Sequence, residues 1–532
     1  MISQKLLGFA LAFISGILLF ASFPPLDWSW AGWIALTPVT IGMIVLDGEK
    51  RQVWLEGLIL SSTFFFSTLI WVTEVSWIGW ILLTLIMLPY PVAWMIVTER
   101  VLRGAQLRLH SFINLYRAAL CSLLWVGLEW MRGWAFSGFP WNYIGASQYR
   151  MVAVIQIAEW GGVLLISWLV VFISMVLGLT CIRIIRETTR KQKMRPHFEF
   201  TLSMLLVGLV LLFGIHVLLD RTESVKEITA LAVQPNIPQD PWKSGMSVKE
   251  TVAKLEVLSI SGLNQSDSDI DLIVWPETPV GQEIYVSPYF REALQAITIQ
   301  RNIPLIMGSI IVTGPKLYNA ALLYPAGGGP PQVYYKNHLV LMGEYVPLPE
   351  NFPLRNYFIP LGQNFTEGTT KVVFSLFDKD VRLAPLICFE DVFSNLARGF
   401  VSGNPDIFVN LTNDGWFNRS FESRQHLANS VFRAVENRRP LLRVSNNGVT
   451  ALIDHKGILR EDAIFGNFSD GSYQEAGTLK VTIEVPGSQR TVYQQFGDWI
   501  GYLGAGALIL VVGQFYLRPR IGFLNLGGRQ RI

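Results

Sequence analysis

The sequence predicts a membrane α-helical bundle of about eight transmembrane helices, joined to one α/β domain outside the membrane. Of the 532 residues, 51% are hydrophobic and only 16% are charged, whereas soluble globular chains carry about 25% charged residues. The apolar residues gather into long runs before residue 222 and near the C-terminus. Residues 226–486 instead alternate short apolar strands with helical patterns, which is typical of layered α/β domains.

Seven apolar runs define an N-terminal membrane domain, residues 1–222. Most approach the roughly 20 residues that a helix needs to cross a bilayer, although the fifth is short. The runs are residues 6–23, 28–46, 54–72, 78–97, 118–130, 161–182 and 201–219. The first run is too long for a cleaved signal peptide, and no small-residue cleavage site follows it. A C-terminal transmembrane helix is predicted at 498–518, followed by a basic tail at 519–532.

Basic residues indicate the orientation of these helices. They gather in the loops after the second, fourth and sixth runs, and the intervening loops are nearly free of them. The basic loop residues are Lys50, Arg51, Arg100, Arg103, Arg108, Arg117, Arg183, Arg186, Arg190, Lys191, Lys193 and Arg195. The positive-inside rule places these loops and both termini in the cytoplasm, so residues 226–486 are expected on the outer side.

Residues 226–486, called the outer domain below, lie between the last two predicted transmembrane helices. Local sequence patterns predict the strands and helices of this domain. We expect strands at 228–233, 272–275, 305–308, 333–335, 383–387, 407–410 and 441–444, and helices at 248–261, 289–300 and 424–437. The net charge of +3 gives no indication of a nucleic-acid partner. Three cysteines argue against a disulfide scaffold. Cys121 and Cys181 lie in apolar stretches, so any reactive role falls on Cys388.

Three residues of the outer domain each follow an apolar strand. They are Glu277, Lys336 and Cys388. Because ligand sites in α/β sheets lie beyond the carboxyl ends of strands, these side chains are expected to converge. Glu277 would then accept the thiol proton as a general base, and Lys336 would stabilise an oxyanion. Phe389, Glu390 and Asp391 are expected to begin a helix whose N-terminal N–H groups would add to this stabilisation. Attack of the thiol on an ester gives a thioester suited to acyl transfer.

Longer motifs surround these residues. They are Trp275-Pro-Glu277, Lys336-Asn-His-Leu-Val-Leu-Met-Gly-Glu344, Cys388-Phe-Glu390, Asn413-Asp-Gly-Trp416-Phe, Arg439-Pro-Leu-Leu-Arg443-Val-Ser-Asn-Asn447 and Glu129-Trp-Met-Arg132. The first three motifs resemble the Glu–Lys–Cys triad of the nitrilase, or carbon–nitrogen hydrolase, superfamily, which implies an αββα sandwich. With seven spans before that domain and one after it, the whole chain resembles the bacterial apolipoprotein N-acyltransferases of the inner membrane.

This resemblance implies a ping-pong reaction that completes lipoprotein maturation. Cys388 would take an acyl chain from a membrane phospholipid and pass it to the α-amine of the N-terminal diacylglyceryl-cysteine of an apolipoprotein. It implies Glu277 as the base, Lys336 as the oxyanion stabiliser, Glu344 and Glu390 as supporting carboxylates, and Trp242, Trp416 and Phe389 as residues near the substrate. It implies a monomer without cofactor or metal. Two departures are Phe389, where family members often have Tyr, and Pro235, where Gly is frequent.

The sequence also permits other interpretations. A tethered amidase acting on small soluble amides would use the same triad, and a non-enzymatic scaffold would use none of it. A Cys–His site with His426 would leave Glu277 and Lys336 without a role, and His338, His426 and His455 lack metal-ligand spacing. Residues 345–365, rich in proline and aromatics, are either a lid or a packed loop. Glu129 and Arg132 are either functional or a structural pair.

Overall fold

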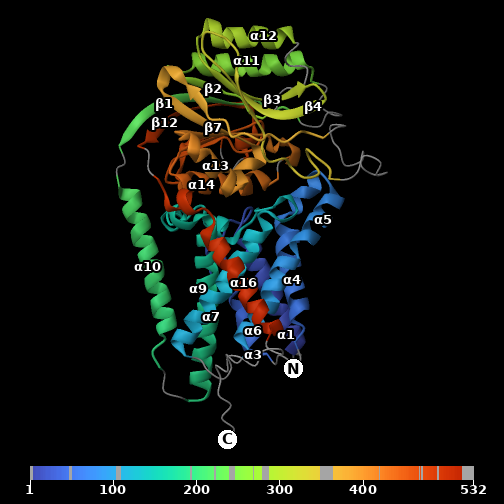
Figure 1. The fold of residues 1–532 in the computed structure, drawn as a ribbon, viewed down its shortest axis with the longest axis vertical. Coiled ribbons are helices and arrows are strands. Elements are labelled where there is room, and N and C mark those ends of the chain that lie inside the picture. The colour runs from blue at the N-terminus through green and yellow to red at the C-terminus, as the bar shows by residue number, and fades with distance from the viewer. Residues whose placement is uncertain are drawn as a thin grey trace.

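The computed structural model contains a helical part and an α/β part stacked along its longest axis (Figure 1). The residues described are 4–46, 51–103, 110–191, 195–220, 223–238, 246–267, 269–277, 287–347, 364–418, 420–466, 468, 471–487 and 490–517. Trp242, most of the predicted lid and the basic tail lie outside this set.

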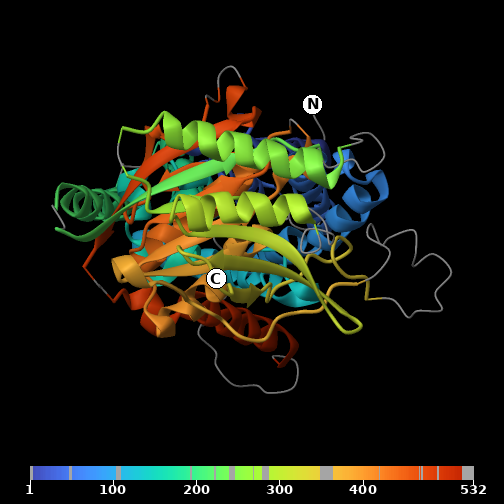
Figure 2. The same ribbon diagram turned by 90° about the horizontal axis from the view of Figure 1, so that it is seen from above.

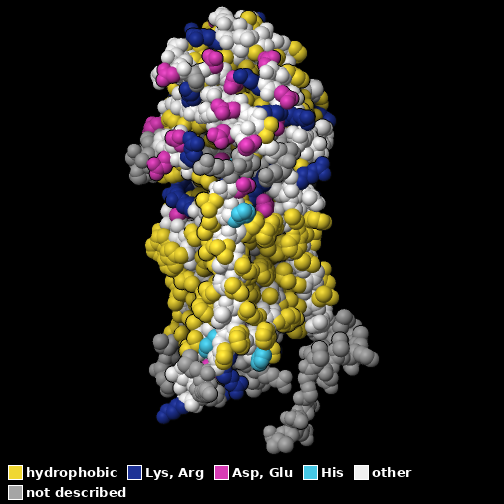
Figure 3. Space-filling view, turned by 90° about the vertical axis from the view of Figure 1, so that its left-hand side faces the viewer, with side chains coloured by type: hydrophobic (Ala, Val, Ile, Leu, Met, Phe, Trp, Pro, Cys, Tyr) yellow, Lys and Arg dark blue, Asp and Glu magenta, His cyan; other side chains and the backbone are white. Residues whose placement is uncertain are grey.

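The helical part reproduces the order of the predicted apolar runs. Its principal helices are α1 (Gln4–Ala21), α3 (Thr37–Val45), α4 (Val53–Thr68), α5 (Trp77–Met87), α6 (Pro89–Leu102), α7 (Ser111–Arg132), α9 (Ala158–Thr189), α10 (Phe198–Leu219) and α16 (Trp499–Leu517). Among the described residues, five helical stretches are long and apolar enough to cross a membrane, and three more are apolar but shorter. Figure 3 shows the hydrophobic band that they form beneath a more charged head.

The fifth run is longer than its apolar residues indicated. Helix α7 has 22 residues and begins at Ser111, because Asn114 and Arg117 continue the helix despite their polarity. Asn114 is buried within the bundle. Helix α10 differs from its neighbours in lying at the side of the bundle, where most of its surface is exposed.

Two six-stranded sheets form the centre of the α/β part. The first has the order β12-β1-β2-β3-β4-β5 and the second β11-β10-β9-β8-β7-β6. The strands of the first sheet are β1 (Ser224–Gln234), β2 (Leu272–Val274), β3 (Leu305–Thr313), β4 (Lys316–Tyr324), β5 (Gln332–Tyr335) and β12 (Gly477–Pro486). Those of the second are β6 (Phe374–Leu376), β7 (Val381–Ile387), β8 (Ile407–Thr412), β9 (Leu441–Ser445), β10 (Ala451–Ile453) and β11 (Leu459–Ile464). Each sheet has three parallel strands, β1–β2–β3 and β7–β8–β9, flanked by antiparallel ones.

Helices cover both outer faces, which completes the αββα sandwich expected from the sequence. Helices α11 (Val248–Asn264) and α12 (Pro288–Gln295) lie side by side over the first sheet (Figure 2). Ser247 and Glu250 form a capping box that fixes the start of α11. Helices α13 (Ser394–Gly399) and α14 (Glu422–Asn437) lie between the second sheet and the membrane helices (Figure 1). Every described residue of α14 except Arg424 is buried, because the helix contacts protein on both sides.

The membrane part meets α14 through the loop that follows α7, which is called the membrane loop below. Arg132 donates a hydrogen bond to the carbonyl of Trp141 (2.6 Å), and Glu129 accepts one from the N–H of Ile144 (2.8 Å). These two charged residues therefore hold the backbone of the loop, which supports the structural interpretation of the pair. Gln425 of α14 accepts a hydrogen bond from the Trp141 indole (2.8 Å) and donates one to the carbonyl of Pro24 (3.0 Å).

Candidate active site

The predicted triad lies where strands of the two sheets end. Glu277 follows β2, Lys336 follows β5 directly and Cys388 follows β7 directly. Glu277 is 7% and Lys336 1% exposed, and Cys388 is half-buried. The structure therefore brings together the three side chains that the strand-end pattern singled out.

Lys336 lies between two carboxylates. Its Nζ is 3.4 Å from Oε1 of Glu277 and 2.9 Å from Oε1 of Glu344. Burial alone would disfavour the ammonium, but Glu344 and Glu277 raise the pKa of Lys336 above its ordinary value. Lys336 is therefore a fixed positive charge. The backbone N–H of Val340 also donates to Glu344 (2.8 Å), so this second carboxylate is held in place from its far side.

Asn319 is a member of the site that the sequence patterns missed. Its Nδ2 donates to Oε1 of Glu277 (2.8 Å) and to Oε1 of Glu344 (2.7 Å). It comes from β4, whose segment Asn319-Ala-Ala-Leu-Leu is otherwise apolar. A buried polar residue at the start of such a stretch was the available signal, because buried amides need partners.

Cys388 has the electrostatics of a thiol that needs a base. Burial and the Glu277 carboxylate raise its pKa well above the ordinary value, against the effect of Lys336. Burial likewise raises the pKa of Glu277, while the nearby Lys336 ammonium and the Cys388 thiol lower it. A neutral thiol beside a carboxylate of raised pKa is the arrangement that general-base catalysis requires.

Glu390 fixes the segment around the thiol. Its carboxylate accepts hydrogen bonds from the backbone N–H groups of Ile387 (2.8 Å), Asn337 (2.7 Å) and His338 (3.1 Å), and from the Tyr334 hydroxyl (2.8 Å). It thereby ties the residue before Cys388 to the residues after Lys336. Burial raises the pKa of Glu390 to about 7.

The helix expected after Cys388 is a single 3-10 turn, Cys388–Val392. The carboxylate of Glu390 accepts the N–H of Ile387, and the chain leaves the turn at Phe393, whose backbone is extended, before α13 begins at Ser394. The backbone N–H groups of this one turn could stabilise negative charge at the site, but the turn is too short to add the dipole of a helix.

The three aromatic residues that were expected near the substrate lie in different surroundings. Phe389 stacks on Trp141 (ring centroids 6.0 Å) and Phe139 (6.1 Å) of the membrane loop. A phenyl ring suits this apolar contact, which explains how Phe can stand where Tyr is frequent. Trp416 lies in the turn Asp414–Phe417 with 41% of its surface exposed, and Trp242 lies outside the described residues.

Comparison with known proteins first defines the class of the α/β part. Residues 229–483 match the carbon–nitrogen hydrolase family, and residues 15–176 match the N-terminal domain of apolipoprotein N-acyltransferase. The family match, together with the fold, accordingly places this part among the carbon–nitrogen hydrolases.

Full-length relatives identify the family more narrowly. The apolipoprotein N-acyltransferase of Geobacter metallireducens is 31% identical over 528 residues, which is 96% of each chain. That of Chlorobaculum tepidum is 29% identical and covers 94% of this chain and 96% of its own. Apolipoprotein N-acyltransferase 1 of Treponema denticola is 30% identical and covers 77% of this chain and 80% of its own. The chain belongs to the apolipoprotein N-acyltransferase family and is an acyltransferase enzyme with several apolar membrane helices.

Proposed function

We propose that the protein transfers an acyl chain from a membrane phospholipid to the α-amino group of the N-terminal diacylglyceryl-cysteine of apolipoproteins. The observation that carries this proposal is the buried Glu277–Lys336–Glu344 group beside Cys388, in a domain whose α14 layer is docked on membrane helices. Together these support an acyl-transfer site that is held next to the bilayer.

In the first half-reaction, Glu277 accepts the thiol proton and the Cys388 sulfur attacks the ester carbonyl carbon. Lys336 stabilises the negative charge that develops on the carbonyl oxygen. Collapse of the tetrahedral intermediate breaks the ester C–O bond. The lysophospholipid alkoxide leaves with the proton from Glu277, and the acyl chain remains as a thioester on Cys388.

In the second half-reaction, the α-amine of the lipoprotein attacks the thioester carbonyl. Glu277 takes a proton from the amine nitrogen, the C–S bond breaks, and the proton returns to the Cys388 sulfur. An amide forms and the enzyme is regenerated. Two substrates that use one thiol in turn give a ping-pong mechanism, for which neither a metal nor another cofactor is required.

The membrane helices give a physical reason for this choice of substrates. Extracting an acyl chain into water costs about 0.8 kcal/mol per CH₂, so a site held at the bilayer surface avoids a large barrier. We propose that the protein is a multi-pass monomer of the bacterial inner membrane, with residues 226–486 periplasmic and both termini cytoplasmic. Residues 1–222 would cross seven times and residues 498–518 once.

The decisive experiment is mass spectrometry of the purified protein after incubation with phospholipid. We expect an acyl adduct on Cys388 that a diacylated lipopeptide amine discharges, and no adduct in Cys388→Ala. Lipid-independent hydrolysis of small amides would favour an amidase instead. Unchanged lipoprotein N-acylation by Cys388→Ala would overturn the proposal.

A further inference from the structure

The backbone at Cys388 adopts an unusual conformation. Its φ is +51°, in the left-handed region that residues other than glycine rarely occupy. Such a conformation persists only where the surroundings hold it. One contact that does so is direct, because Nδ2 of Asn410 on β8 donates a hydrogen bond to the carbonyl of Cys388 (3.0 Å).

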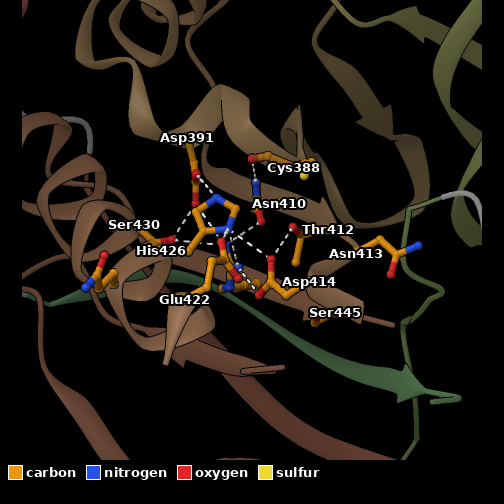
Figure 4. Close-up of polar contacts among 12 residues, drawn as sticks. Cys388, Asp391, Asn410, Thr412, Asn413, Asp414, Glu422, His426, Ser430 and Ser445 are labelled. Carbon is orange, nitrogen blue, oxygen red and sulfur yellow. Dashed lines mark hydrogen bonds and ion pairs between the residues drawn. The ribbon is translucent and has the colours of Figure 1, made fainter. Parts of the chain in front are cut away.

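Arg443 of β9 supports this contact from behind. Its guanidinium is completely buried and donates to Oδ1 of Asn410 (3.1 Å), to Oδ2 of Asp391 (3.1 Å) and to Oδ2 of Asp414 (2.7 Å). One planar cation therefore contacts both the amide that holds Cys388 and the carboxylate three residues after it. Figure 4 shows Asn410 directly beside the Cys388 backbone, with Asp391, Asp414 and His426 close to one another nearby.

His426 of α14 holds the same carboxylate from the other side. Its Nε2 is 2.7 Å from Oδ1 of Asp391, and its Nδ1 is 3.0 Å from Oδ1 of Asp414. Burial and Arg443 disfavour the imidazolium, but Asp391 and Asp414 raise the pKa of His426 to about 10. Despite burial, Arg443 and His426 lower the pKa of Asp414 to about 2. Two cations thus balance two anions.

This balance also bears on metal binding. Asp414, Glu422 and His426 offer ligand atoms within 4.8 Å of one another. However, Nη2 of Arg443 lies 2.7 Å from Asp414 and 2.8 Å from Nδ1 of His426, so a cation already stands among them. Burial and the nearby Asp414 charge raise the pKa of Glu422 well above its ordinary value, which favours its neutral form. The group is better explained as a closed ion network than as a metal site.

The membrane part covers this network. The Trp141 ring lies 5.3 Å from the His426 ring and 6.0 Å from the Phe389 ring, measured between centroids. The indole N–H of Trp141 donates to Gln425, the residue before His426. The side chains that hold the nucleophile turn are therefore enclosed between the second sheet and the membrane loop.

We infer that Arg443 and His426 are positioning residues, which hold the Cys388 turn in its left-handed conformation through Asn410, Asp391 and Asp414. In this conformation the thiol faces Glu277 and Lys336. Without it, the buried thiol loses both the base that removes its proton and the cation that favours the thiolate. The inference rests on the proposed role of Cys388 as nucleophile and adds residues that act on it indirectly.

Alkylation of the full-length protein by iodoacetamide tests the inference, with mass spectrometry reporting each cysteine separately. The variants are Arg443→Lys, which keeps the charge but not the planar contacts, and His426→Gln. The matched controls are Arg439→Lys and His455→Gln, because Arg439 donates to the carbonyl of Pro405, and His455 contributes a backbone carbonyl that accepts from Arg438 and is kept in the variant. Cys388 of the wild type is the reference, and buried Cys121 reports loosening of the fold.

We expect both variants to alkylate Cys388 about tenfold or more slowly than the wild type does, because Glu277 would no longer be placed to take the thiol proton during the reaction. Both controls should match the wild type, with Cys121 protected throughout. Unchanged Cys388 reactivity would overturn the inference, and alkylation of Cys121 would assign these residues to general folding instead. A wild type that alkylates normally but forms no acyl adduct with phospholipid would contradict the proposed function and leave this inference standing.

Discussion

Replacing Glu277 by Gln tests the assignment of the base with little change in shape. The variant keeps a side chain that can contact Asn319, and Lys336 remains paired with Glu344 at 2.9 Å. Repulsion between the two carboxylates, which raises the pKa of Glu277, is removed. The buried ammonium is therefore not left unpaired, and we expect a much smaller loss of stability than the roughly 3–5 kcal/mol typical of a broken buried ion pair.

The effect on chemistry should be far larger. A positioned general base contributes about 10²–10⁴-fold to a rate, which corresponds to roughly 3–5 kcal/mol of barrier at about 1.4 kcal/mol per tenfold change. Because the pKa of Cys388 is raised, the thiol is protonated at neutral pH and cannot compensate for the loss. Without the base, the acylation rate should instead rise with pH, about tenfold per unit, as hydroxide generates the thiolate.

The assay is single-turnover formation of the acyl adduct on Cys388, followed by mass spectrometry at a series of pH values. Thermal unfolding of the variant confirms that it is folded, and Glu367→Gln, an exposed carboxylate, is the matched control. Adduct formation within threefold of the wild-type rate, or a loss confined to Glu344→Gln, would refute the assignment of Glu277 as the base.

Three further predictions concern the surroundings of the site. Asn319→Leu should slow adduct formation about tenfold or more, because two buried carboxylates each lose a donor; single-turnover rates equal to the wild type would contradict this. Since the folded-state pKa of His426 is about 10 and its ordinary value 6.5, its stabilising contribution is complete below pH 6.5 and is lost as pH rises toward 10. Thermal unfolding across this range should therefore decline less steeply in His426→Gln, and parallel curves would argue against a charged His426. Gln425→Leu should lower the apparent unfolding temperature by roughly 5 °C, because buried groups of the membrane part lose their partners; exposed Gln495→Leu should not.

Much of the architecture follows from local sequence patterns. The apolar runs correspond to helices in order, and the seven predicted strands lie within or overlap observed ones. The polar start of α7 could not be read from hydropathy, since Asn114 is buried by neighbouring helices that a local window does not include. The pairing of β1 with β12, about 250 residues later, depends on contacts of a range that local patterns do not encode.

The site divides in the same way. Glu277, Lys336 and Cys388 could be predicted from the sequence because each follows an apolar strand. Asn319, Asp391 and Arg443 were not assigned roles, because their functions depend on partners from other elements. Arg443 did offer a signal, since an arginine within the buried strand Leu-Leu-Arg-Val-Ser requires buried anions to compensate it.

The register of β1 and β12 determines how the α/β part would respond to mechanical load. Strand β1 begins at Ser224, shortly after α10, and strand β12 ends at Pro486, before the segment that leads to α16. Ser224 and Pro486 are paired with each other. Both connections to the helical part therefore leave from the same end of one strand pair. Lateral tension that separates α10 from α16 would peel this ladder open one residue pair at a time, the geometry in which hydrogen-bonded strands resist force least.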